Sequence, residues 1–462
     1  MSKDDFTSIA ICSRLFIIIL QFISNLIIPD HEAHVFQYLR QYSEENKFFS
    51  ILNTSLSGFV RWDAEYFMHI AKYGYTFENT LAFFPIYPYI IRSVSWICRP
   101  LFYGASIDTV LLIVFITLNV VFLVLSVKVL YKLTCLFFDE NIAGRTAILF
   151  IFNPASIFFT APYTECLFCY LTFESIYRCT LLSRKFSKPN AVIKWGDANV
   201  LLYISLSTGV RSNGLLNIGF LIYTILCIFF TYFPKDKTDI IKHIFKYILI
   251  LSISCIVCML PFICFQVFSY KQFCTDFNTD LPKEIMIYAS KNEFVLPGQF
   301  SKYRQVWCFS QIPLAYSYVQ DHYWNVGFLR YYEIKQIPNF LLAFPCLYIT
   351  IRNCLFHLKQ NMNHYKNLFN LKFISGKTPN TKEQFFKFGL TVFVVHALIL
   401  AVFCTFCIHI QVSTRMICSA TPLFYWYCAY YWINGKDKII KLYFDSYFFI
   451  GTVMFCNFLP WT

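Results

Sequence analysis

Long apolar runs recur along the chain, and short polar or basic stretches separate each run from the next. A membrane-spanning helix needs about 20 mostly apolar residues. We predict about eleven spans on this basis. Several are shorter than a full crossing and could instead be half-helices or re-entrant hairpins. The predicted spans cover residues 8–28, 110–131, 146–160, 163–177, 198–210, 214–232, 247–268, 338–352, 388–409, 416–433 and 443–459.

This pattern predicts an all-α polytopic membrane protein, with a single integral membrane domain over residues 1–462. The composition agrees, because 57% of the 462 residues are hydrophobic and only 14% are charged. No small-residue cleavage site follows the first run, so residues 8–28 are predicted to be an uncleaved signal anchor. The formal charge of +13 could indicate a nucleic-acid partner, but Lys and Arg cluster between apolar runs and no nucleic-acid motif accompanies them.

The distribution of basic residues predicts the orientation of the chain. With the N-terminus placed in the cytosol, Lys and Arg concentrate in the short cytosolic connections, as the positive-inside rule expects. The lumenal side then receives two long segments of balanced charge, residues 29–109 and 269–337. A glycosylation sequon at Asn53 lies in the first of these and supports the assignment. Residues 353–387 are predicted to form a mobile cytosolic loop.

The 19 cysteines lie mostly inside apolar runs and are interpreted as small buried hydrophobic residues. Cys404 and Cys407 have the spacing of a metal-ligand pair, but no second pair or histidine cluster completes a site, so no metal is predicted. Cys274 and Cys308 fall in the second long segment. They could form a disulfide if that segment lies in an oxidising lumen.

One segment, residues 59–89, gathers acidic, basic and aromatic side chains in a chain where charge is scarce. A solvated connecting loop is the alternative interpretation. Other polar groups interrupt the apolar runs and fall on the same lumenal face. Each of these groups could be explained alone as a helix end, a turn or an arginine that reaches the lipid headgroups. These explanations do not account for why all the groups fall on one face. The candidates are Arg61, Trp62, Asp63, Glu65, Glu165, Arg211, Asn213, Trp324, Arg330 and Arg415.

A cleft lined by a few carboxylates and several arginines suits an anionic substrate carried by a lipid, because guanidinium groups bind phosphate oxygens. The sequence has no Gly-x-x-x-x-Gly-Lys-Ser/Thr loop, which disfavours ATP-driven transport, and no Gly-x-Ser-x-Gly elbow. It also has no Asp-x-Asp pair to hold a metal on a nucleotide-sugar diphosphate. A lipid monophosphate therefore fits the donor better.

Sugar transfer from a lipid phosphate needs a base for the attacking hydroxyl and positive charge for the leaving phosphate. We predict Asp63 as the base, because it lies beside an aromatic residue and an arginine in the most charge-dense lumenal motif. Glu165 or Glu65 is predicted to be a second acid that orients the acceptor. The predicted substrate contacts are Arg61, Trp62, Arg211, Asn213, Trp324, Arg330 and Arg415. Among them, the sequence does not rank the arginines as phosphate ligands.

Residues 61–88, RWDAEYFMHIAKYGYTFENTLAFFPIYP, resemble the first lumenal loop of the GPI mannosyltransferase 2 family. Further matching segments are NPASIFFTAPYTECLF at 153–168, GVRSNGLLNIGF at 209–220, WNVGFLRYYEIKQIPNFLLAFP at 324–345, QVSTRMICSATP at 411–422 and NFLPWT at 457–462. Any one tetrapeptide would be weak, but the combination is specific and extends from residue 61 to the C-terminus.

This resemblance implies a GT-C-like, multispanning glycosyltransferase of the endoplasmic reticulum that uses a lipid phosphosugar. It implies dolichyl-phosphate mannose as donor, a mono-mannosyl GPI precursor as acceptor, and a new α-1,6 linkage. The reasoning from the residues predicts in addition that the transfer inverts the sugar carbon and needs no metal or cofactor. The resemblance is compatible with a small membrane partner subunit. The family's Trp-Asp motif maps onto Trp62 and Asp63, with Asp63 as the catalytic acid. Tyr66 departs from the family, in which His is common, so it is assigned no catalytic role.

Three other functions stay open from the sequence. The chain could be another dolichyl-phosphate-sugar-dependent glycosyltransferase of the endoplasmic reticulum, one that elongates the dolichol-linked oligosaccharide. A lipid transporter or scramblase could also use charged residues in its spans, but it would favour polar groups through the whole membrane depth and inverted repeats. The chain shows neither feature. The third alternative is a non-catalytic assembly subunit.

Overall fold

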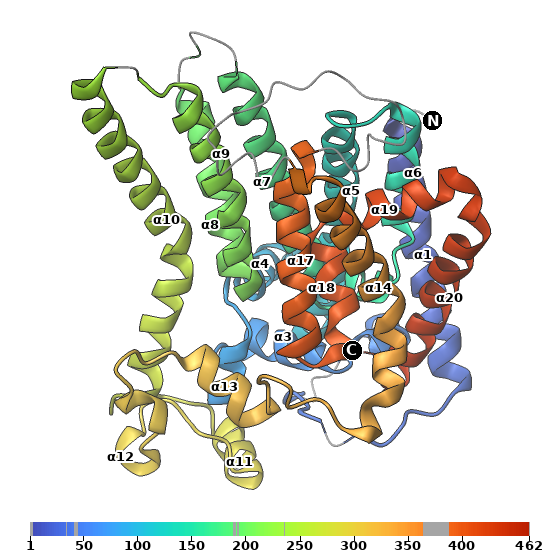
Figure 1. Cartoon of the computed structure of the whole chain (residues 1–462). Helices are drawn as coiled ribbons and strands as arrows, with labels where there is room; N and C mark the ends of the chain where they lie inside the picture. The colour runs from blue at the N-terminus through green and yellow to red at the C-terminus, as the bar shows by residue number, and fades with distance from the viewer. Residues whose placement is uncertain are drawn as a thin grey trace.

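The computed structural model describes residues 3–33, 35–40, 45–187, 191, 194–234, 236–363 and 388–461, and these form helices and no strand. Figure 1 shows a bundle of long helices with a cap of short helices at its lower end. The helices are α1 (Lys3–Ile27), α2 (Lys47–Leu56), α3 (Asp63–Tyr73), α4 (Ile86–Cys98), α5 (Ile107–Cys135), α6 (Glu140–Ile151), α7 (Glu165–Phe186), α8 (Asn199–Val210), α9 (Ile218–Thr231), α10 (Lys237–Phe273), α11 (Lys283–Asn292), α12 (Phe300–Tyr303), α13 (Ala315–Trp324), α14 (Ile337–Gln360), α17 (Thr391–Phe406), α18 (Ser413–Ala420), α19 (Pro422–Tyr431) and α20 (Asp437–Cys456).

Six stretches of the described chain are long and apolar enough to cross a membrane, so the predicted count of about eleven spans is not confirmed. The difference lies in the short runs. α6 and α8 have only 12 residues each, and α7 carries several charged side chains along its 22 residues. The six stretches are Asp5–Ile27, Ile107–Cys135, Ser212–Thr231, Thr238–Phe273, Ile334–Gln360 and Pro422–Cys456.

The two long polar segments lie at the same end of the bundle. Residues 28–106 connect α1 to α5 and contain α2, α3 and α4, while residues 274–336 connect α10 to α14 and contain α11, α12 and α13. In Figure 1 the N-terminus lies at the upper end, whereas α3, α11, α12 and α13 lie at the lower end. α14 extends to Gln360, and the rest of the predicted cytosolic loop, residues 364–387, lies outside the described residues.

A second, smaller hydrophobic cluster joins the cap to the bundle. It includes Phe84 from the first long segment, Phe265 from α10 and Trp307 from the second long segment. The structure also joins Cys274 to Cys308 in a disulfide, with the two Cα atoms 5.5 Å apart. Both long segments are therefore tied to the lower end of α10, close to the site described below.

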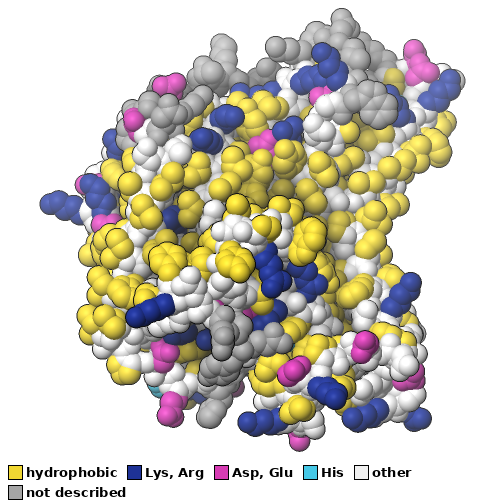
Figure 2. Space-filling model, turned by 180° about the vertical axis from the view of Figure 1, so that it is seen from behind, with side chains coloured by type: hydrophobic (Ala, Val, Ile, Leu, Met, Phe, Trp, Pro, Cys, Tyr) yellow, Lys and Arg dark blue, Asp and Glu magenta, His cyan; other side chains and the backbone are white. Residues whose placement is uncertain are grey.

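The bundle surface is largely apolar. Figure 2 shows hydrophobic side chains spread over the middle of the molecule. Charged side chains gather toward its two ends, and a group of Lys and Arg side chains also lies in a hollow near the centre of this face. α10 contributes strongly to this surface, and its exposed side chains include Ile241, Ile248, Ile256, Leu260 and Val267. Exposed apolar surface of this extent is stable where lipid covers it, so the chain is a multi-pass membrane protein.

Candidate active site

The charged motif begins helix α3. Trp62 precedes this helix with φ 57° and ψ −126°, a backbone conformation that a residue with a side chain rarely adopts. Such strain costs about 1–3 kcal/mol and persists only where the surrounding structure holds it. Asp63 is the first residue of the helix, where the partial positive charge of the helix N-terminus favours a carboxylate.

Asp63 forms an ion pair with an arginine 352 residues away in the sequence. Its Oδ2 atom lies 2.7 Å from Nη2 of Arg415, which belongs to α18. The guanidinium of Arg415 also lies 5.3 Å from the ring centroids of Phe158 and Tyr163. The Asp63 side chain is 25% exposed, whereas that of Arg415 is 9% exposed. The Asp63 carboxylate is therefore accessible to a substrate, whereas Arg415 is buried against the two aromatic rings.

A second carboxylate joins two arginines. Glu165, the first residue of α7, is fully buried and forms an ion pair with Arg211. The same oxygen, Oε1, lies 3.9 Å from Nη1 of Arg415. Burial alone would lower the pKa of Arg415, but the carboxylates of Asp63 and Glu165 raise it above its ordinary value. We call the four residues Asp63, Glu165, Arg211 and Arg415 the Asp63 cluster.

The chain around Arg211 folds tightly to place its side chain. α8 ends at Val210, Arg211 is extended, and residues 212–217 turn back in a 3-10 helix. A Cβ atom at Gly214 would lie 2.4 Å from the carbonyl oxygen of Ser207, so only glycine fits here. Arg211 also donates a hydrogen bond to the hydroxyl of Thr164, 3.3 Å away. The turn thus directs the guanidinium to the start of α7.

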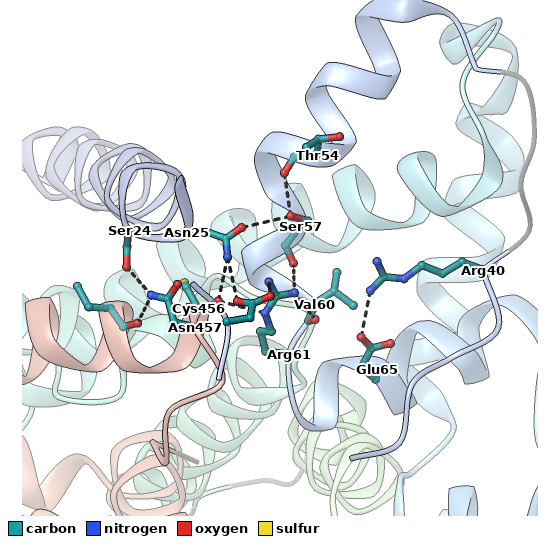
Figure 3. A network of polar contacts seen from close by, with 12 residues as sticks. Ser24, Asn25, Arg40, Thr54, Ser57, Val60, Arg61, Glu65, Cys456 and Asn457 are labelled. Carbon is teal, nitrogen blue, oxygen red and sulfur yellow. Dashed lines mark hydrogen bonds and ion pairs between the residues drawn. The ribbon is translucent and has the colours of Figure 1, made fainter. Parts of the chain in front are cut away.

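Glu65 lies outside the Asp63 cluster, although it follows Asp63 by two residues. It is 2% exposed, accepts a hydrogen bond of 3.0 Å from the backbone N–H of Tyr38, and forms an ion pair of 3.1 Å with Arg40. Figure 3 shows this pair on the side of the motif away from the Arg61 network. Glu65 therefore fastens residues 35–40 to α3, and burial raises its pKa.

Arg61 also makes protein contacts that occupy its guanidinium. It donates hydrogen bonds to the backbone oxygens of Cys456, at 3.0 Å, and Ser57, at 2.9 Å, and pairs with Asp30 at 2.8 Å. Figure 3 shows how these bonds connect the motif to the end of α20. Only 7% of the Arg61 side chain is exposed. The structure thus gives Arg61 a role in tying the C-terminal residues to α3.

Among the described residues, no ion pair or hydrogen bond joins the three other candidates to the Asp63 cluster. Arg330 is half-exposed and pairs with Asp321, nine residues earlier. The ring of Trp324 packs edge-on against Phe83 and against Tyr66, which lies one turn after Asp63 on α3. The buried side-chain nitrogen of Asn213 has no hydrogen-bond partner among the described residues.

Comparison with known proteins identifies the family. The model of a family described as mannosyltransferase (PIG-V) matches residues 3–462. This chain belongs to that family. A protein named GPI mannosyltransferase 2 from Drosophila pseudoobscura pseudoobscura is 34% identical over 99% of both chains. A human protein named GPI alpha-1,6-mannosyltransferase 2 is 32% identical, over 100% of this chain and 99% of its own. The resemblance found in the sequence motifs is therefore confirmed.

One solved structure also shows an overall likeness. It is an archaeal oligosaccharyltransferase, AglB from Archaeoglobus fulgidus, in complex with an inhibitory peptide and a dolichol-phosphate. It is 10% identical to this mannosyltransferase, with a TM-score of 0.42, and the match covers 97% of this chain and 55% of the archaeal chain.

A small groove lies beside the Asp63 cluster of this mannosyltransferase. Phe158, whose ring faces Arg415, forms part of its wall, and Thr414 is the residue before that arginine. The rest of the wall is mainly apolar. It consists of Pro154, Ala155, Leu342, Ala343, Gln411, Tyr447, Pro460 and Trp461.

One residue near Asp63, His409, is not among the candidates predicted from the sequence. Its Nε2 atom lies 2.7 Å from the backbone oxygen of Trp324, and its ring stacks on Tyr331 at 4.6 Å. Burial lowers the pKa of His409, while the bond to Trp324 and the nearby Asp63 carboxylate act in the opposite direction. A lone histidine at the end of an apolar run gives no signal of such a position.

No group of three or more His, Cys, Asp or Glu side chains that could hold a metal ion occurs in the described part of this mannosyltransferase. Cys404 is buried and Cys407 half-buried, and both thiols are free. That the enzyme works without a metal stays a prediction, which chelation tests below.

Proposed function

We propose that this protein transfers the second mannose, in α-1,6 linkage, from dolichyl-phosphate mannose to the mono-mannosyl GPI precursor on the lumenal side of the endoplasmic reticulum membrane. Membership of the mannosyltransferase (PIG-V) family and the names of its relatives support the reaction class and the acceptor. The observation that carries the mechanism is the Asp63–Arg415 ion pair, which holds an accessible carboxylate beside a buried cation.

The groove beside the Asp63 cluster supports a lipid-phosphate donor. In such a donor the phosphate is bonded directly to the reacting sugar carbon, so the lipid chain must leave the site within a few bonds of that carbon. An apolar groove that ends at the phosphate-binding arginine meets this requirement. Phe158 lies at that junction, because it lines the groove and faces Arg415. The groove is therefore assigned to the first part of the donor's prenol chain.

The reaction is a single displacement at the anomeric carbon. Asp63 accepts the proton of the acceptor hydroxyl as its oxygen bonds to that carbon, and the bond from the carbon to the phosphate oxygen breaks. The electron pair leaves with the dolichyl phosphate, whose growing charge is stabilised by Arg415 and Arg211. Attack opposite the leaving group inverts the configuration of the carbon, and no metal or cofactor takes part.

Glu165 fits the orienting acid better than Glu65 does. Its Oε1 atom binds Arg211, while Oε2 is buried without a hydrogen-bond partner among the described residues. That free acceptor can bind an acceptor hydroxyl, and so fix the sugar ring relative to Asp63. Both oxygens of Glu65, by contrast, already bind Arg40 and the backbone of Tyr38.

The site is assigned to the lumen, with the N-terminus in the cytosol and a GT-C-like arrangement of the spans. The Cys274–Cys308 pair supports this side, because disulfides form in oxidising compartments. The sequon offers a direct check. Asn53 lies in α2, at the end of the molecule that carries α3, so endoglycosidase treatment should increase the mobility of the protein on a gel.

The deciding experiment is mannose transfer in membranes from cells that lack their own second GPI mannosyltransferase. Such cells should accumulate a GPI lipid with one mannose, and this chain should convert it to the two-mannose form. The new linkage should be cut by an α-1,6-specific mannosidase. Using membranes retains any small partner subunit that the enzyme requires.

Two results would overturn the proposed function. One is that removal of this protein from its own cells leads to accumulation of a truncated dolichol-linked oligosaccharide in place of the one-mannose GPI lipid, which would indicate a related enzyme. The other is that the one-mannose lipid, present in normal amount, stays unconverted although this chain is expressed at a normal level. That result would leave transport or assembly as its role.

A further inference from the structure

A single buried hydroxyl supports both sides of the strained residue that precedes Asp63. The Tyr163 hydroxyl accepts a hydrogen bond of 3.1 Å from the backbone N–H of Asp63, and donates one of 3.4 Å to the backbone oxygen of Arg61. A tyrosine hydroxyl has one proton to donate and lone pairs to accept, so it can make both bonds at once. It thus bridges the peptide groups on either side of Trp62.

The same tyrosine also supports the partner of Asp63. Its ring centroid lies 5.3 Å from the guanidinium carbon of Arg415, a distance at which the ring face attracts a cation. The ring is fully buried and packs against Phe67, Phe158 and Phe455. Its neighbours therefore leave it little freedom to move away from the ion pair.

The indole of Trp62 does not hold the strained backbone by hydrogen bonding. Its Nε1 atom is buried without a hydrogen-bond partner among the described residues, and the ring contacts Phe458 edge-on at 5.8 Å. The first N–H groups of a helix have no partner within the helix, so the Asp63 N–H depends on an outside acceptor. Tyr163 supplies that acceptor.

We propose that Tyr163 is a positioning residue for the transfer reaction, which holds the Asp63 carboxylate and the Arg415 guanidinium in their reactive arrangement. This inference rests on the proposed function. Without the hydroxyl, the Asp63 N–H has no partner and the Trp62 backbone can relax, which moves the carboxylate. A shift of about 1 Å in a catalytic group can lower a rate by about 10²-fold.

The test compares two substitutions of Tyr163 in mannose transfer from dolichyl-phosphate mannose. Tyr163→Phe removes the hydroxyl but retains the ring, so kcat should fall by about 10–100-fold while KM for the donor changes by less than about twofold. Tyr163→Leu also removes the ring beneath Arg415, so KM for the donor should rise as well. Tyr75→Phe is the matched control, because the buried Tyr75 hydroxyl donates to the oxygen of Phe83.

A double substitution separates positioning from folding. Asp63→Glu retains a carboxylate but displaces it, so Tyr163→Phe should lower kcat much less in that background than in the wild type. A residue that only stabilises the fold would lower the amount of folded protein and leave kcat per folded molecule unchanged. It would also act equally in both backgrounds.

Three outcomes would overturn the positioning role while the wild-type enzyme remains active. They are a kcat of Tyr163→Phe within about twofold of the wild type, a loss in the double variant equal to the product of the single losses, and an equal fall in kcat for Tyr75→Phe. A wild-type enzyme that transfers no mannose would instead overturn the proposed function itself.

Discussion

Asp63 and Glu65 lie on the first turn of the same helix, yet the structure places them in different environments. Asp63 is one-quarter exposed and faces a buried arginine from α18, which the chain supplies from its distant C-terminal part. Glu65 is 2% exposed and faces Arg40, whose own side chain is 53% exposed, in a segment that crosses α3. In the Asp63 pair the carboxylate is accessible and the arginine is buried. In the Glu65 pair the carboxylate is buried and the arginine is exposed.

This reversal separates a reactive carboxylate from a structural one. A base must meet its substrate, so its carboxylate needs an open side, and the cation that holds it should be fixed from behind. A carboxylate that fastens a loop is most effective when it is buried and fully hydrogen-bonded. The sequence favours Asp63 as the base but leaves Glu65 open as a second acid, because the structural role of Glu65 depends on the partners that the fold brings to it.

After loss of the Asp63 carboxylate itself, the largest effect is expected from removing Arg415, the buried arginine of the accessible pair. Arg415→Met leaves Asp63 without its partner and the leaving phosphate without its main cation, so kcat should fall by about 10²–10³-fold. Arg330→Met is the matched control, since its exposed pair with Asp321 should contribute at most about 1 kcal/mol. Transfer assays on both variants, normalised to folded protein, check this. Equal losses would contradict the ranking of the two arginines.

The next largest loss of activity is expected from Glu165→Gln. The change removes the only negative charge bound to Arg211 among the described residues and weakens the hold on Arg415. Breaking a buried ion pair from one side typically costs about 3–5 kcal/mol, so thermal unfolding should shift clearly to lower temperature. Activity of the remaining folded enzyme should fall by about tenfold or more, because the acceptor loses an orienting oxygen. A variant as stable as wild type would argue against this ion pair.

Substitutions in the Arg40–Glu65 pair should lower the stability of the protein but leave its rate of mannose transfer unchanged. Arg40→Met leaves the buried Glu65 carboxylate short of one partner, which should cost about 1–3 kcal/mol of unfolding free energy. Glu65→Gln leaves only the exposed Arg40 without a partner and should cost less. Denaturant or thermal unfolding in detergent checks the order. Transfer per folded molecule should stay near the wild-type value in both variants.

Chelation is expected to have the smallest effect. Excess EDTA should leave the rate of mannose transfer within about twofold of the untreated enzyme, because no metal assists the phosphate leaving group. A loss of activity that added Mg²⁺ or Mn²⁺ restores would show that a metal shares the phosphate with the two arginines.

Part of this arrangement could be predicted from the sequence. The runs 8–28 and 110–131 became α1 and α5, because long uninterrupted apolar runs leave little choice of structure. The positive-inside rule placed the polar interruptions on one face, and four of them do form a cluster at one end of the bundle. Short runs such as 146–160 were less predictable, because a partner in the fold decides whether they span.

The rest depends on contacts between distant parts of the chain. Nothing local to Arg61 shows that Asp30 and Cys456 will occupy it, and nothing near Arg415 shows that Asp63 will bind it. Tyr163 was visible in the sequence only as a neighbour of Glu165. Its two hydrogen bonds to residues 100 or more positions away appear only in the fold.

The most direct test of the account compares mannose transfer by Asp63→Asn and Glu65→Gln, each measured per molecule of folded enzyme with saturating donor and one-mannose acceptor. Both substitutions remove one negative charge from the same helical turn with little change in shape. We predict that Asp63→Asn loses about 10²–10⁴-fold in rate, while Glu65→Gln stays within about threefold of the wild type. Retained transfer by Asp63→Asn, or an equal loss in both variants, would contradict it.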